Sequence, residues 1–239
     1  MELSKDTIQF LMNKEKNPVI EIDGLKYNVD LNNKLFPIIN SVKYLEVETL
    51  SSIIDYIKLN IDNMDKSKLF IHIESEKKVS LKSYLKDYNF RETIIVSEKA
   101  EDSFRFNAFM SHENFIIGLS TSFILNKDLE ELLNAIGRVS NNAVKTISDD
   151  GLSQEITVKK GLELNGYKKI PTILNLKPYR TFFEVDQPES SFLVRAKEGK
   201  NEEAPEFALF EADGGFWKNK AKENIYNFLK DALNIPVIV

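Results

Sequence analysis

The chain of 239 residues contains no cysteine. It therefore has no disulfide bond, no thiolate nucleophile and no zinc site built on sulfur, and such a composition fits a reducing compartment such as the cytoplasm. The first residues lack the basic, apolar and small-residue order of a secretory signal, and no apolar run approaches the roughly 18 residues that span a bilayer. We expect a cytoplasmic protein without a membrane partner.

A surplus of positive charge is also missing. The 32 lysines and arginines are outnumbered by 37 aspartates and glutamates, which gives a formal net charge of -5 at pH 7. Proteins that bind nucleic acid commonly neutralise its phosphates with a basic surplus. Bulk charge therefore argues against a nucleic-acid partner unless a local basic patch exists.

Motifs that fix a particular chemistry are absent as well. The sequence has no G-x-G-x-x-G or G-x-x-x-x-G-K-[ST] phosphate loop and no G-x-S-x-G nucleophile elbow. Its two histidines, His72 and His112, have no H-x-x-H spacing that would form a metal site. We assign no catalytic residue and no cofactor, and we expect a binding protein rather than an enzyme.

What is present is enough apolar sequence, 42% of residues, for one large domain or two small ones. A short helix capped by Ser4 precedes a hairpin that turns at Asp23-Gly24. A second helix, capped by Thr49, has an apolar side from Leu50 to Ile61, and with its flanking strands it predicts one β-α-β unit. The strands of this first part are expected at residues 43–48, 69–73, 79–84 and 90–96.

The second part begins near residue 99 with two helices, one capped by Ser111 and one over residues 127–138, which predict a helical hairpin. Period-two alternation then predicts an antiparallel sheet, and a helix over residues 217–233 has one apolar side. The strands are expected at residues 143–148, 154–159, 172–176, 181–185, 191–196 and 207–212. The fold class is α+β: a small N-terminal α/β part (1–98), then the helical hairpin and an antiparallel sheet packed by the C-terminal helix (99–239), in two domains or one continuous domain.

The chain ends in an apolar segment, although most chains end in polar, frayed residues. Its side chains must be covered either as an edge strand of the protein's own sheet, which we favour, or as an arm on a neighbouring subunit. The residues that would make such an oligomer contact are Ile235, Val237, Ile238 and Val239.

Two stretches of the second part carry a resemblance. The run from Pro178 to Ser190, with Ala208 to Gly215, resembles phage proteins of low-GC Gram-positive bacteria. Ile170-Pro171, the alternating residues Phe192–Ala196 and the terminal Pro236-Val237 are similar to the YfdQ-like family of phage and prophage proteins of unknown function. The resemblance covers residues 45–239 and is specific from about residue 154 onward. It implies a viral protein that acts early, in the cytoplasm of the host cell, and it carries over no catalytic residue.

Three carboxylates form a candidate metal site. Glu184, Asp186 and Glu211 could hold Mg²⁺ or Mn²⁺ through oxygen ligands, as metal-dependent nucleases do. Acidic residues beside strands are more often solvent-exposed surface residues that bind no metal, and we favour that interpretation. The sequence also lacks a nearby lysine or histidine that would complete a familiar nuclease pattern.

A second candidate site would bind a small anion. Tyr179 and Arg180 could hold a phosphate or a base by stacking and bidentate bonding, although an ion pair of Arg180 with Glu184 inside the sheet is the favoured alternative. Gly214 and Gly215 precede a helix, whose N-terminus attracts anions, and Asn219 lies in its first turn. A plain turn with Asp213 as a cap is the favoured interpretation of the two glycines.

These observations predict a non-enzymatic phage accessory protein that acts through self-assembly and by binding a host or phage protein. A role in countering host defence and a role in supporting replication both remain open. The alternatives are a binder of a nucleotide or other small anionic ligand and, after that, a metal-dependent nuclease.

Overall fold

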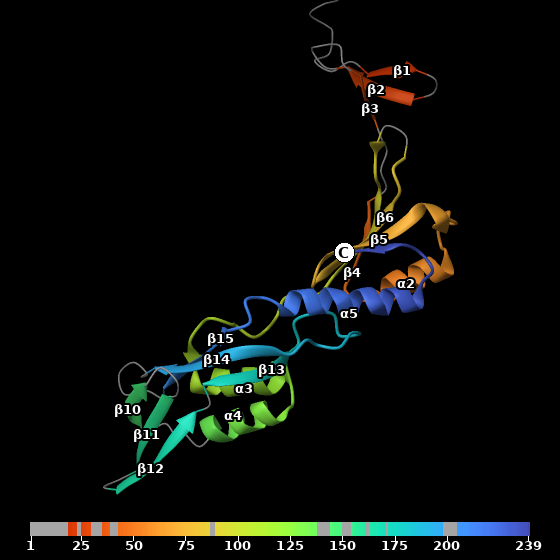
Figure 1. Cartoon of the computed structure of the whole chain (residues 1–239). Coiled ribbons are helices and arrows are strands. Elements are labelled where there is room, and N and C mark those ends of the chain that lie inside the picture. The colour runs from red at the N-terminus through yellow and green to blue at the C-terminus, as the bar shows by residue number, and fades with distance from the viewer. Residues whose placement is uncertain are drawn as a thin grey trace, which may run out of the picture.

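The computed structural model describes residues 19–22, 25–29, 35–38, 43–86, 89–137, 144–149, 154–160, 163–170, 172–197 and 205–239. The fold is α+β, as the sequence predicts. Two five-stranded sheets, each covered by a pair of helices, form the main body, and two smaller three-stranded sheets lie toward the ends of the molecule (Figure 1).

The first five-stranded sheet has the strand order β16-β5-β6-β7-β4. Strands β5, β6 and β7 form an antiparallel meander, while β4 runs parallel to β7 and β16 runs parallel to β5. The predicted β-α-β unit is therefore present, but β6 and β7 lie between its two strands. The bounds are β4 (Leu45–Val47), β5 (Leu69–Ser75), β6 (Lys78–Ser83), β7 (Thr93–Glu98) and β16 (Val237–Ile238).

Helix α2 (Leu50–Leu59) begins where the sequence predicts. The Thr49 side chain accepts a hydrogen bond from the backbone N–H of Ser52, which satisfies one of the free donors of the first turn. Asn60 adopts the left-handed conformation and ends the helix, so Ile61 lies outside it and is 62% exposed. The predicted place of Ile61 on the apolar face was wrong because an asparagine C-cap was not recognised. A short 3-10 helix, Lys66–Lys68, leads into β5.

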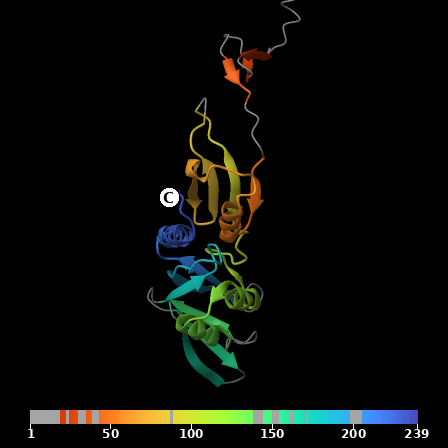
Figure 2. The ribbon, with the colours of Figure 1, turned by 90° about the vertical axis from the view of Figure 1, so that its right-hand side faces the viewer.

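Helix α5 (Trp217–Ala232) confirms the predicted helix but packs on a different sheet. Its buried residues Ile225 and Leu229 join the core cluster of α2 and β5, and the helix lies beside the first sheet (Figure 2). The predicted packing of this helix on the antiparallel sheet of the second part was wrong. The apolar stripe of a helix does not specify which sheet it covers, and here the chain after α5 continues into β16 beside β5.

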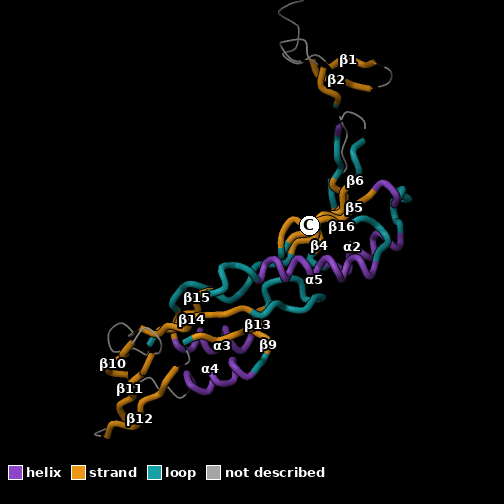
Figure 3. The backbone as a smooth tube through the Cα atoms, in the orientation of Figure 1, coloured by secondary structure: helices purple, strands orange, loops and turns teal. Residues whose placement is uncertain are grey.

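The second five-stranded sheet has the order β8-β15-β14-β13-β9 and is antiparallel throughout. The predicted helical hairpin covers it (Figure 3): α3 (His112–Ser122), capped by Ser111, lies against β15, and α4 (Lys127–Gly137) lies against β13. Phe115, Phe192 and Phe207 are fully buried between the layers. The strand bounds are β8 (Met110–Ser111), β9 (Phe123–Ile124), β13 (Ile173–Pro178), β14 (Ser190–Lys197) and β15 (Glu206–Glu211).

The strand predicted at residues 181–185 does not form. This stretch belongs to a loop between β13 and β14, and the buried side chain of Gln187 holds it. Gln187 accepts hydrogen bonds from the backbone N–H groups of Arg180 and Thr181 and donates to the carbonyl oxygens of Phe182 and Val185. Because one side chain satisfies these backbone groups, they need no neighbouring strand.

Two three-stranded sheets complete the described part. The predicted hairpins of residues 19–29 and 143–159 are confirmed as antiparallel pairs, while their turns and the predicted N-terminal helix lie outside the described residues. Strand β12 was not predicted. The bounds are β1 (Val19–Ile22), β2 (Leu25–Val29), β3 (Leu35–Pro37), β10 (Val144–Asp149), β11 (Gln154–Lys160) and β12 (Glu163–Ile170).

The apolar C-terminal segment forms the edge strand β16, the alternative favoured from the sequence. Ile235 and Val237 pack against the core of the first sheet, whereas Ile238 and Val239 are exposed. No helix in the described ranges is long and apolar enough to cross a membrane.

Candidate functional site

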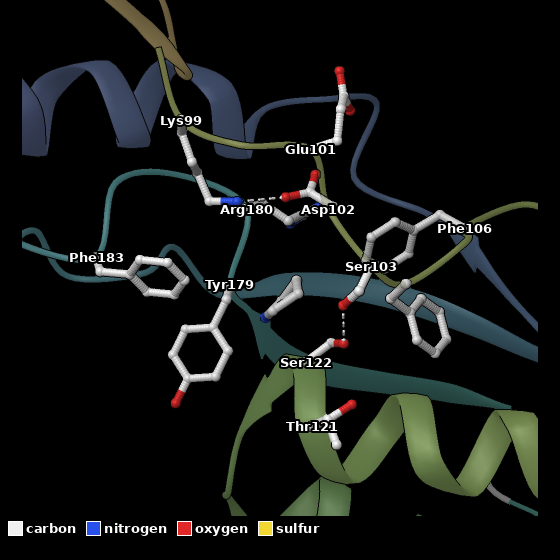
Figure 4. A pocket seen from close by; sticks show the side chains of 12 residues that line it. Lys99, Glu101, Asp102, Ser103, Phe106, Thr121, Ser122, Tyr179, Arg180 and Phe183 are labelled. Carbon is white, nitrogen blue, oxygen red and sulfur yellow. Dashed lines mark hydrogen bonds and ion pairs between the residues drawn. The ribbon is translucent and has the colours of Figure 1, made fainter. Parts of the chain in front are cut away.

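A cavity of about 220 Å³ lies at the junction of the two five-stranded sheets. Three segments that are far apart in the sequence form its walls (Figure 4). Lys99, Asp102 and Ser103 follow β7, Ser122 ends α3, and the loop after β13 contributes the residues Tyr179, Arg180 and Phe183.

Arg180 is the most deeply buried charged group of this junction, with a side chain that is 3% exposed. Its Nη1 donates to Glu211 Oε1 at 2.5 Å, and its Nη2 donates to Ser190 Oγ. The guanidinium carbon lies 3.9 Å from the centroid of the Trp217 ring, a cation–π contact. Arg180 thus connects β15, β14 and the start of α5.

The electrostatics of Arg180 follow from its burial. Burial lowers the pKa of Arg180 to about 10, although the carboxylates of Glu211, Asp213 and Asp102 act in the opposite direction. The guanidinium therefore keeps its charge at neutral pH. Its Nε is buried and has no hydrogen-bond partner among the described residues.

Asp102 is a second centre of charge at the cavity. Its carboxylate forms ion pairs with Lys99 Nζ at 2.8 Å and with Lys77 Nζ at 2.6 Å. The side chain of Lys99 is only 7% exposed. Because Lys77 lies in the turn between β5 and β6, Asp102 joins the first sheet to the segment that leads to the second.

Aromatic rings form the outer wall of the cavity. The rings of Tyr179 and Phe183 lie 5.7 Å apart at 53°, and Lys99 Nζ lies 5.5 Å from the centroid of the Phe183 ring. Phe183 is 72% exposed, which is unusual for a phenylalanine. On the opposite side, the hydroxyl groups of Ser103 and Ser122 are hydrogen-bonded at 2.9 Å.

The structure brings together part of the predicted anion site. Tyr179 and Arg180 both line the cavity. Gly214 and Gly215 have positive φ angles, and the N–H of Gly215 donates to Asp213 Oδ1 at 3.0 Å, which confirms the predicted turn. The predicted cap by Asp213 was wrong, because the N-cap of α5 is Phe216 and no side chain caps the helix. Asn219 lines a different hollow, together with Tyr226 and Val239.

The three predicted metal ligands are engaged separately. Glu184 Oε1 accepts a hydrogen bond from the backbone N–H of Ser51 in the first turn of α2, while Glu211 binds Arg180. Asp186 is exposed, and its backbone carbonyl accepts from Asn224. Within the described ranges no group of three or more histidine, cysteine, aspartate or glutamate side chains could hold a metal ion. The expected Arg180–Glu184 pair is replaced by Arg180–Glu211 because residues 181–185 form a loop.

Both histidines make contacts within the fold. His112 Nε2 lies 3.0 Å from the carbonyl oxygen of Ile136, which joins α3 to α4. His72 Nδ1 lies 3.2 Å from Lys82 Nζ on the neighbouring strand. Neither lines the junction cavity.

Sequence reasoning missed Lys99, Asp102 and Phe183. The first two lie at the predicted start of the second part, near residue 99, and Phe183 lies in the strand predicted at residues 181–185. No local pattern could have placed Lys99 and Asp102 beside Arg180, since about 80 residues separate them from it in the chain. Phe183 is three residues from Arg180, and it was missed because the stretch forms a loop and not the predicted strand.

Comparison of the chain with models of known protein families, with curated proteins and with solved structures finds no match. The fold defines the class of this protein as α+β, and chemical argument about function rests on its own residues. The junction cavity offers fixed cations, hydroxyl groups and aromatic rings, which are suited to binding a small acceptor-rich molecule.

Proposed function

We propose that this protein is a non-enzymatic accessory protein of phage or prophage origin that assembles with copies of itself in the cytoplasm of a bacterial host. The origin is supported by the resemblance of the second half to phage proteins. The assembly is supported by the small N-terminal sheet.

The observation that carries the proposal is the exposure of strand β1. All four of its residues are exposed, although three of them, Val19, Ile20 and Ile22, are aliphatic. Leu35 on β3 is exposed as well, and the sheet lies apart from the main body (Figure 1). A sheet of three strands needs a covered apolar face for stability, and contiguous exposed apolar residues mark interaction sites.

The edge position of β1 favours a second copy of the chain as its partner. Proteins usually protect an edge strand with charges or prolines, but β1 has only Glu21, which lies opposite Lys26 on β2. This strand pair has no surplus of either charge that would select an acidic or a basic partner. Antiparallel pairing of β1 with the same strand of another copy is self-complementary and buries the aliphatic residues of both.

The test is the native mass over a range of protein concentrations, measured by size-exclusion chromatography with light scattering. We expect a mass that is a multiple of the single chain. The variant Ile20→Lys should shift the protein to the monomer because it places two like charges in the paired edge. The variant Ile117→Lys is the control, since Ile117 is an exposed isoleucine on α3, in the other half of the molecule.

A wild-type protein that stays monomeric at high concentration would refute assembly through β1. So would an oligomer whose mass Ile20→Lys leaves unchanged.

A further inference from the structure

We infer that the junction cavity is a binding site for a small anion with one planar ring, of the nucleoside monophosphate class. This inference does not depend on assembly, because every residue that lines the cavity belongs to the main body. It rests on the donors that face the cavity, on the aromatic wall and on the size of the space.

The carboxylates around the cavity are already engaged. Asp102 binds two lysines, Glu211 binds Arg180, and Asp213 accepts from the backbone of Gly215. Glu101 also lies at the cavity, but its side chain is fully exposed, so water and salt screen its charge. Of the two carboxylates that line the cavity, Asp102 is compensated by lysines and Glu101 is screened by solvent, so an incoming anion meets no uncompensated buried carboxylate in the lining.

Hydrogen-bond donors remain in the same place. Lys99 Nζ has three donors and uses two, for Asp102 and for the carbonyl oxygen of Ala100. Arg180, whose guanidinium keeps its positive charge, lines the same cavity.

The aromatic wall favours a planar ring. Phe183 stands exposed at the mouth of the cavity, with Tyr179 beside it and the charged end of Lys99 near its face (Figure 4). Planar heterocycles stack on such rings, and the stacking of one base contributes on the order of 1–3 kcal/mol. The rings and the cations together select a ligand with one flat part and one anionic part.

The volume limits the size of this ligand. About 220 Å³ is less than the roughly 300–1,000 Å³ of pockets that hold drug-sized molecules. One ring with a sugar or a single acidic group can occupy it, while a polymer or a dinucleotide can place only a part there. A nucleoside monophosphate has a ring, a sugar and one phosphate, so the cavity does not enclose it whole: its sugar and phosphate occupy the space, and its base lies over the exposed ring of Phe183.

The experiment measures binding of AMP, GMP, CMP and UMP to the full chain by calorimetry and thermal shift. Inorganic phosphate tests the anion alone, and benzoate tests a ring with a carboxylate but without sugar or base. We expect saturable binding of at least one nucleotide, tighter than that of phosphate or benzoate. Phe183→Ala should raise its Kd about tenfold, as the loss of one stacking partner predicts.

The control is Phe216→Ala. Phe183 and Phe216 are both 72% exposed, but only Phe183 lines the cavity, so Phe216→Ala should leave the Kd within about twofold if the site is as inferred. The inference is overturned if none of the four nucleotides binds, if phosphate or benzoate binds as tightly as the best nucleotide, or if Phe183→Ala changes the Kd no more than Phe216→Ala does. The native mass stays the same in all these variants, so failure here is distinct from failure of the proposed assembly.

Discussion

Arg180 keeps its positive charge although its side chain is almost completely buried. The groups around it determine how unfavourable the buried charge is. Burial makes the charge unfavourable, while Glu211, Ser190 and the Trp217 ring make it tolerable. A buried ion pair of this kind need not add net stability. Breaking it, however, leaves a charge without compensation.

We therefore expect Glu211→Ala to destabilise the protein clearly. Because the Glu211 side chain is 30% exposed, the loss should be about 1–3 kcal/mol, below the roughly 3–5 kcal/mol of a fully buried pair. Chemical denaturation at pH 7 measures it. Glu206→Ala is the matched control: Glu206 lies on the same strand, is also 30% exposed and pairs with Lys197, so its loss should be about 1 kcal/mol or less. Equal losses in the two variants would contradict the role of Arg180.

The lowered pKa of Glu74 predicts that the free energy of unfolding depends on pH. Burial alone would raise its pKa, but hydrogen bonds from Lys82 and Ser80 outweigh burial, and the pKa of Glu74 lies below its ordinary value of 4.5. A carboxyl group with a lowered pKa stabilises the folded state above its unfolded pKa, and this contribution is lost as the pH falls through the folded pKa.

Glu74→Gln should therefore lower the free energy of unfolding at pH 7 by roughly 1 kcal/mol or less. The difference from the wild type should shrink as the pH falls below 4.5, toward the lowered pKa of Glu74. Urea denaturation from pH 7 to pH 3 measures both. A difference that stays constant over this range would show that the charge of Glu74 does not contribute.

At the scale of elements, α3 depends on a close approach that only glycine permits. A Cβ atom at Gly118 would lie 2.7 Å from the Phe104 ring, and Phe104 is buried among other aromatic residues. Gly118→Ala should therefore destabilise the protein by about 1–3 kcal/mol through overpacking, although alanine favours helix by up to about 1 kcal/mol. Gly137→Ala on α4 is the control, since nothing lies within 4 Å of that position, and it should be neutral or stabilising. Thermal unfolding of both variants distinguishes them, and an equal effect would exclude the steric explanation.

Contacts within single elements explain which parts of the fold the sequence could predict. Helix α2 begins at Thr49 because a capping side chain acts within four residues, and β14 pairs with β15 because alternation and the intervening charged segment are local. The sheet that α5 covers and the loop that Gln187 holds depend on contacts that no window of the sequence contains. The site divides in the same way: Tyr179 and Arg180 were found from their residue types, whereas Lys99 and Asp102 reach them only through the fold.

For the molecule as a whole, the loop after β13 locks the two five-stranded sheets together. It extends from the second sheet, yet Phe182 and Val185 are buried in the core cluster of the first. Thr181 Oγ1 donates to the carbonyl oxygen of Glu76 in the turn between β5 and β6. Because α5 and β16 also return to the first sheet, the chain crosses the junction more than once. This connectivity favours one continuous domain over two domains that meet near residue 98.

If the two five-stranded sheets unfold as one cooperative unit, Phe182→Ala should destabilise both of them. Phe182 is 1% exposed, and removal of its ring should cost about 3–5 kcal/mol. If the sheets unfold together, native-state hydrogen exchange should show this loss in the most protected amides of β14 as well as those of β5, because both exchange through the same global opening. Leu209→Ala, in the core cluster of the second sheet, is the reciprocal test and should lower protection in both sheets too. If each substitution affected only the sheet whose core it belongs to, the junction would connect two independent domains, since the loop would then hold the sheets in place without coupling their unfolding.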